Sequence, residues 1–199
     1  MNRLLLYCTK AKPYLVYHRE YCSLSPTEYI EYGYETRWED KCMLEDVCNG
    51  TIVAECDFDV DEITNCGTSF MIMKYDDLQD NYKYTNEIAR GSCLDYIDLR
   101  GYLGTNNGYA IHIKNLHIFD KPRELKEYYK DNFLQELNTS DTRVYKAPQN
   151  MMNVYDIKGN HYILISIQPQ WLCKILNGEK TIEVRKKVLK EMLENETSI

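Results

Sequence analysis

Short apolar runs separated by turn residues dominate the hydrophobic pattern, and they predict several β-strands with few helices. Residues 3–8 (RLLLYC) and residues 161–167 (HYILISI) are the two most apolar runs, and both predict buried strands. Residues 109–119 are rich in β-branched and aromatic side chains, which predicts a third strand after the turn at Asn106-Asn107-Gly108. From Ile52 to Asp61, apolar and polar residues alternate, so this stretch predicts a half-buried strand.

The polar face of the predicted strand 52–61 carries Glu55, Asp57, Asp59 and Asp61. Four carboxylates in a row are compatible with cation binding, but one strand without a convergent partner favours a solvated sheet edge. The eight cysteines include no pair at the spacing of a zinc knuckle. The sequence therefore predicts reduced thiols, no metal site and no other cofactor.

The predicted helices are short. Ser92 and Asp95 resemble a capping box that opens a helix closed by Gly104. Residues 123–137 carry an imperfect helical stripe, and residues 186–199 predict a terminal amphipathic helix. Pro169 suits the first turn of a helix whose apolar face includes Trp171, Leu172, Ile175 and Leu176.

Two stretches lack a clear period. Residues 17–48 predict an insertion loop rich in tyrosine, and residues 64–90 predict a connecting region with one short strand around 70–73. After the helix from Pro169, residues 181–185 alternate, so Ile182 and Val184 are expected to point into the core while Glu183 and Arg185 share the opposite face.

Length and composition are those of a folded domain. The 199 residues are 44% hydrophobic and 28% charged, which excludes wholesale disorder. Because 24 basic residues stand against 31 acidic ones, the net charge is -7, and any nucleic-acid contact must come from a local basic patch. No apolar run approaches the roughly 18 residues of a membrane span, and the leucines after Arg3 are too few for a secretory signal. A cytoplasmic protein without membrane contact is expected.

One segment carries a family resemblance. Residues 163–187, ILISIQPQWLCKILNGEKTIEVRKK, combine a strand, a proline-started helix and the pattern Gly-x-Lys-x-x-Glu-x-Arg. This segment resembles the opening motif of the ASCH domain, a member of the PUA-like superfamily of small β-barrels. Four other stretches resemble later parts of ASCH proteins of phage and prophage type: LLYCTKAKPYL, NGTIVAECDFDVDEI, SCLDYIDLRGYLGTNNGYAIHIKNLHIFDKPREL and KAPQNMM.

The order of these stretches implies a circular permutation. The resemblance makes residues 1–199 a single α+β domain, a PUA-like β-barrel with flanking helices, in which residues 161–187 supply the usual N-terminal strand, helix and strand. Residues 153–160 would link the old ends, because the termini of compact domains often lie close together. The strand 161–167 should then pair with the strand 3–8 of the same molecule. A truncated second copy and strand exchange between two chains are the alternatives.

The resemblance also implies a cleft that binds RNA or a modified nucleobase. Lys180, just past the helix end, can hold a phosphate or, if desolvated, act as a base. Glu183 can accept a hydrogen bond from a base edge while Arg185 grips an oxygen. The alternative is a weak surface ion pair beside a solvated lysine.

Four further residues complete the candidate ligand-binding set. Gly178 suits a left-handed helix cap next to Lys180, and the resemblance places Thr9 and Lys10 near the same cleft. His112 can reach the cleft as a donor or as an acid-base group, although a structural histidine fits the pattern as well. Trp171 can stack on a base or pack in the core.

The leading hypothesis is a nucleic-acid or nucleotide binding module. The first alternative is a hydrolase, either a ribonuclease or an amidohydrolase acting on a modified nucleoside, with Lys180 and Glu183 as its catalytic pair. Some ASCH relatives remove the acetyl group from acetylated cytidine with a lysine and a threonine three residues on, and Glu183 stands in that threonine's place. The second alternative is a phage-encoded anti-defence protein that binds a host protein through an acidic, tyrosine-rich face.

Overall fold

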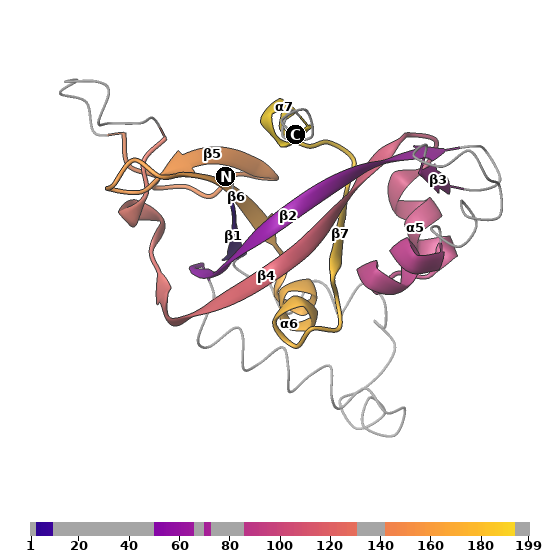
Figure 1. Ribbon diagram of the computed structural model, residues 1–199, viewed down its shortest axis with the longest axis horizontal. Coiled ribbons are helices and arrows are strands. Elements are labelled where there is room, and N and C mark those ends of the chain that lie inside the picture. The colour runs from indigo at the N-terminus through magenta and orange to yellow at the C-terminus, as the bar shows by residue number, and fades with distance from the viewer. Residues whose placement is uncertain (1–2, 10–49, 66–69, 73–85, 131–141, 194–199) are drawn as a thin grey trace, which may run out of the picture.

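The computed structural model describes residues 3–9, 50–65, 70–72, 86–130 and 142–193 (Figure 1). Its strands are β1 (Arg3–Cys8), β2 (Ile52–Asn65), β3 (Phe70–Ile72), β4 (Gly108–Arg123), β5 (Met151–Tyr155), β6 (His161–Ile167) and β7 (Ile182–Arg185). Its helices are α5 (Tyr96–Leu103), α6 (Pro169–Leu176), α7 (Lys190–Leu193) and the 3-10 turn η1 (Leu125–Glu127), and residues 86–92 are also helical.

The strands form one mixed sheet in the order β5-β6-β1-β2-β4-β7, and β3 adds to β2. In the described sheet, β1 and β6 are parallel and every other pair is antiparallel. The predicted α+β class is confirmed. The strand order is open, because β5 and β7 occupy opposite ends and the described residues show no ladder between them.

The parallel pair joins the two most apolar stretches of the sequence. Its register runs from Arg3 opposite Tyr162 to Cys8 opposite Ile167. Both strands are interior, since β1 also pairs with β2 and β6 with β5. Strands covered on both faces read as continuous apolar runs, which explains the lack of alternation in these two. The prediction that residues 161–167 lie beside residues 3–8 in one molecule is confirmed.

The two faces of the sheet bury different cores. On one face, Leu4, Leu6, Ile163 and Ile165 pack with residues of α6 and with Met192 of α7. On the other face, two separate clusters form, one around Leu5, Leu164, Tyr128 and Phe119, the other around Leu99, Leu103, Ile182 and Val184. The second of these clusters packs α5 against β7 (Figure 1).

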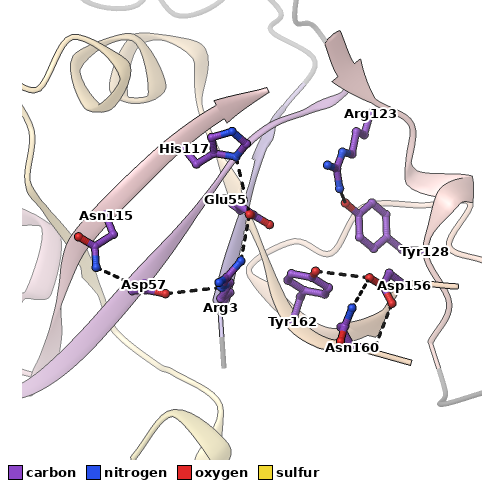
Figure 2. Close-up of polar contacts among 10 residues, drawn as sticks. All are labelled: Arg3, Glu55, Asp57, Asn115, His117, Arg123, Tyr128, Asp156, Asn160 and Tyr162. Carbon is purple, nitrogen blue, oxygen red and sulfur yellow. Dashed lines mark hydrogen bonds and ion pairs between the residues drawn. The ribbon is translucent and has the colours of Figure 1, made fainter. Parts of the chain in front are cut away.

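Strand β2 pairs with β4 along most of its length, but β1 covers its other side only from Ile52 to Cys56. In the described part of the chain, residues 57–62 pair with β4 alone, so the predicted sheet edge is confirmed there, whereas residues 52–56 are interior. Figure 2 shows Arg3 between Glu55 and Asp57, at 3.1 Å and 3.7 Å, with Asn115 donating to Asp57 at 2.8 Å. Farther along, Lys114 pairs with Asp59, and His112 lies 2.9 Å from Asp61. Each carboxylate of this acidic row therefore has a cross-strand partner on β1 or β4.

Residues 156–160 form a tight turn between β5 and β6. Asp156 Oδ1 accepts hydrogen bonds from the backbone N–H groups of Lys158 (2.8 Å) and Asn160 (2.9 Å), and Asp156 Oδ2 accepts one from the Asn160 side chain at 2.8 Å (Figure 2). Gly159 has the positive φ of 81° that this turn requires. Burial acts to raise the pKa of Asp156, but these hydrogen bonds outweigh it and lower the pKa. The predicted linker 153–160 thus comprises the end of β5 and this turn.

Several predicted element boundaries need correction. The predicted helix 123–137 is wrong in its described part, because β4 runs to Arg123 and only the 3-10 turn Leu125–Glu127 follows. Asp95, not Ser92, caps α5, accepting from the Asp98 N–H at 2.7 Å. The terminal helix begins at Lys190 rather than at 186. Strand β3 confirms the short strand near 70–73, and the insertion 17–48 lies outside the described residues.

Candidate ligand site at strand β7

The turn between α6 and β7 places Lys180. Helix α6 begins with Pro169 and buries Leu172 and Ile175, so its axis is fixed against the sheet. Gly178 follows the helix with φ of 76°, and its N–H donates to the Ile175 carbonyl at 3.0 Å. The Lys180 N–H then returns to the Lys174 carbonyl at 2.9 Å. Gly178 is exposed, and its observed role is to supply the left-handed conformation that turns the chain back.

Lys180 is buried. Only 3% of its surface is exposed, and its Nζ donates to the Ser92 carbonyl at 2.8 Å and lies 3.3 Å from Glu183 Oε2. Its ammonium also lies 5.2 Å from the ring centroid of Trp171. Burial lowers the pKa of Lys180, and the Glu183 carboxylate partly offsets this effect. The alternative of a solvated lysine is therefore wrong.

Glu183 links Lys180 to Arg185. Glu183 is 8% exposed, and its Oε1 lies 2.8 Å from Arg185 Nε. This contact is an ion pair without hydrogen-bond geometry, since the buried Nε–H has no hydrogen-bond acceptor in the described part of the chain. The alternative of a surface ion pair is also wrong, because the side chains of Lys180, Glu183 and Arg185 are 3%, 11% and 15% exposed.

Arg185 also links β7 to the opposite end of the sheet through side-chain hydrogen bonds. Its Nη1 donates to Asn150 Oδ1 at 3.1 Å, and its Nη2 donates to the Ser166 carbonyl at 2.7 Å. Asn150 precedes β5 and Ser166 belongs to β6, whereas Arg185 ends β7. Asn150 Nδ2 donates in turn to the Lys187 carbonyl at 3.1 Å. Side-chain hydrogen bonds thus bring together the two ends of a sheet that strand pairing leaves open.

The cluster carries more positive than negative charge. When all three groups are ionised, the two cations Lys180 and Arg185 share the single carboxylate of Glu183. No second carboxylate among the described residues forms an ion pair with either cation. An excess buried charge is costly unless a counter-ion approaches or the group loses its proton. The arrangement can therefore bind an anion, or hold Lys180 in its neutral, basic form.

The other predicted site residues do not join this cluster. In the β4–β7 ladder, His112 is opposite Ile182 while Ile111 is opposite Glu183, so His112 and Glu183 occupy opposite faces of the sheet. His112 is instead bound to Asp61. Thr9 directly follows β1, and its N–H donates to the Ile167 carbonyl at 2.9 Å; in the described part of the chain no hydrogen bond or ion pair joins it to the cluster. Lys10 lies outside the described residues.

Sequence reasoning missed the partners that come from distant segments. The Ser92 carbonyl is held against β7 because the Thr181 N–H donates to the neighbouring Gly91 carbonyl at 2.8 Å. A side chain at Gly91 would lie 2.7 Å from Ile182 Cδ1, so glycine permits this close approach. The next residue, Cys93, has a positive φ of 56° and donates its thiol to the Glu179 carbonyl at 3.4 Å. The glycine was the one local signal for this contact.

The core-packing role considered for Trp171 is observed, and base stacking stays a prediction. Its ring packs against the core that contains Leu172 and Ile175, while two lysines face it, Lys180 at 5.2 Å and Lys174 at 5.6 Å from the ring centroid. The aromatic face is thus part of the charged site.

Within the ranges that the structure covers, no helix is long and apolar enough to cross a membrane. The same ranges contain no group of three or more His, Cys, Asp or Glu side chains arranged to hold a metal ion. Comparison of the chain with protein-family models, with curated proteins and with solved structures gives no match.

Proposed function

We propose that this protein binds a nucleotide, as a recognition module for RNA or for a modified nucleobase, at the cluster of Lys180, Glu183 and Arg185. The observation that carries the proposal is the buried pair of cations sharing one carboxylate. A phosphate would supply the missing negative charge, and Glu183 would accept from a base amine. Trp171 adds an aromatic face beside the ammonium of Lys180.

We further propose that the domain is a circularly permuted ASCH-like fold of the PUA-like class. Support comes from the strand, helix and strand of β6, α6 and β7, which gather the residues of the Gly-x-Lys-x-x-Glu-x-Arg pattern in one turn and strand. The parallel pairing of β6 with β1 is what an intramolecular permutation requires. The short hairpin between β5 and β6 would join the original ends.

The test of nucleotide binding is a Lys180→Met variant. Methionine keeps the length and volume of the side chain but removes its charge, so the affinity for nucleoside monophosphates and short RNAs is expected to fall about 10-fold to 100-fold, the value of a charge-assisted hydrogen bond. Isothermal titration or thermal shift at fixed salt measures the change.

Lys158→Met is the control, because Lys158 is exposed in the turn between β5 and β6 and forms no ion pair with Glu183. Its affinity should stay within about threefold of the wild type. Equal affinities for the wild type and the Lys180→Met variant would overturn the assignment of the site.

A hydrolase is the second candidate, and one observation favours it. Burial lowers the pKa of Lys180 next to the Glu183 carboxylate, which is the environment of a lysine that acts as a base. In that case Lys180→Met should abolish turnover of an acetylated nucleoside or an RNA while binding is largely retained. If the Lys180→Met variant loses binding and the wild type shows no turnover, the protein is a recognition module and not this enzyme.

No specific observation favours a host-protein partner at the acidic face. The carboxylates of Asp57 and Asp59 are engaged by Arg3, Asn115 and Lys114. The tyrosine-rich stretch 17–48 lies outside the described residues.

A further inference from the structure

Positive charge is concentrated around the candidate site. The segment 168–190 contains six basic residues and two acidic ones, a local net charge of +4 in a chain whose net charge is -7. The acidic residues are Glu179 and Glu183; the basic ones are Lys174, Lys180, Arg185, Lys186, Lys187 and Lys190. Lys186 and Lys187 are exposed and directly follow Arg185. These two exposed lysines form a local basic patch, as nucleic-acid binding by an acidic protein requires.

An aromatic side chain lies beside this patch. Tyr102, in the last turn of α5, is 40% exposed, and the Lys186 ammonium lies 5.3 Å from its ring centroid. Burial raises the pKa of the Tyr102 hydroxyl, while Arg185 and a hydrogen bond from the Lys186 backbone act in the opposite direction. Tyr102 is therefore close to the charges of the cluster, and its ring remains partly open to solvent.

We propose that Tyr102, Lys186 and Lys187 bind the nucleotide next to the one held at the cluster, so that the ligand is single-stranded RNA rather than a free nucleoside or mononucleotide. This inference rests on the proposed function. An exposed aromatic ring flanked by lysines is the arrangement with which proteins bind single strands: the ring stacks on a base and the ammonium groups contact phosphates. The cluster reads one nucleotide, and the outer surface holds its neighbour.

The test compares short labelled oligouridylate and oligoadenylate with UMP and AMP, by fluorescence anisotropy and by competition. The wild type should bind the oligonucleotides more tightly than the mononucleotides. Tyr102→Ala should weaken oligonucleotide binding at least about fivefold, the effect of losing one stacked base, and Tyr102→Phe should retain it. Mononucleotide affinity should remain unchanged in both variants.

Salt dependence tests the two lysines. In the Lys186→Gln/Lys187→Gln double variant, affinity for the oligonucleotides should depend less steeply on salt. The negative slope of log affinity against log salt should become shallower by about 1.4, because each single-strand phosphate contact contributes about 0.7. The matched control is Lys121→Gln/Lys158→Gln, which makes the same change in net charge at two exposed lysines outside the segment 168–190. Its slope should equal that of the wild type.

The outcomes distinguish this inference from the proposed function. Wild-type protein that binds mononucleotides and oligonucleotides equally, with no effect of Tyr102→Ala or of the double lysine variant, overturns the inference and leaves nucleotide binding at the cluster intact. Wild-type protein that binds none of these probes overturns both. Thermal unfolding of each variant confirms that the compared proteins are folded.

Discussion

Replacing Glu183 with glutamine is expected to lower the free energy of unfolding by about 3 to 5 kcal/mol. Glu183 is the only described carboxylate that pairs with Lys180 and Arg185, at 3.3 Å and 2.8 Å. Glutamine keeps the shape of the side chain but leaves two largely buried cations without a counter-charge. Urea unfolding followed by circular dichroism measures the effect.

Glu179→Gln is the control for this prediction. Glu179 lies in the same turn and carries the same charge, but its side chain is exposed, so its replacement should change stability by less than about 0.5 kcal/mol. The double variant Lys180→Met/Glu183→Gln should be less destabilised than the sum of the single variants, because it removes the unpaired charge of Lys180 and leaves only Arg185 without a counter-charge. Similar losses for Glu183→Gln and Glu179→Gln would show that the buried cluster does not exist.

Replacing Leu164 with alanine is expected to lower the free energy of unfolding by about 2 to 5 kcal/mol. Leu164 is fully buried in β6, opposite Leu5 of β1, and both belong to the cluster that includes Tyr128. The truncation removes packing at the junction of the two ends of the sequence. The same urea experiment measures this loss.

Leu193→Ala provides the comparison, because Leu193 in α7 is 42% exposed and its truncation leaves no enclosed cavity. Its effect should be below about 1 kcal/mol. If Leu164→Ala were equally mild, then β6 would not be an interior strand, and the pairing with β1 that supports the permutation would be wrong.

The elements best predicted from sequence are those whose own residues indicate how buried the element is and where it ends. Residues 3–8 and 161–167 are mostly apolar without alternation, and each strand has neighbours on both sides. Pro169 and Gly178 mark the two ends of α6 and its turn by their backbone preferences alone. These signals place Lys180, Glu183 and Arg185 near one another without knowledge of the rest of the fold.

The position of β2 could not be predicted because its partners are far away in the chain. Arg3 and Lys114 pair with Asp57 and Asp59, and each lies about fifty residues away in the chain, on either side. The predicted helix 123–137 failed for a related reason. Tyr128 and Tyr129 have helical spacing from Leu125, but Tyr129 instead exchanges backbone hydrogen bonds with Tyr155, at 2.8 Å each.

The candidate site was predicted in its charges but not in its surroundings. Spacing along one strand put Glu183 and Arg185 together. Lys180 and Arg185 also donate to the backbone carbonyls of Ser92 and Ser166, and residue type gives no signal for a backbone acceptor. His112 was placed at the site because strand alternation alone does not specify which face of β4 meets Glu183. The observed register with β7 settles that point.

The most direct test of the central claim is the pKa of Lys180, measured by NMR with lysine labelled at the ε-carbon and with Lys180→Met to assign the signal. In the free protein, Lys180 should titrate below the ordinary range of lysine, because burial disfavours its charged form. Saturation with a short oligouridylate should raise this pKa, since a bound phosphate stabilises the ammonium, and affinity should fall as the pH rises through the Lys180 pKa of the free protein. A Lys180 signal that titrates like an exposed lysine, and that oligouridylate leaves unchanged, would contradict nucleotide binding at this cluster.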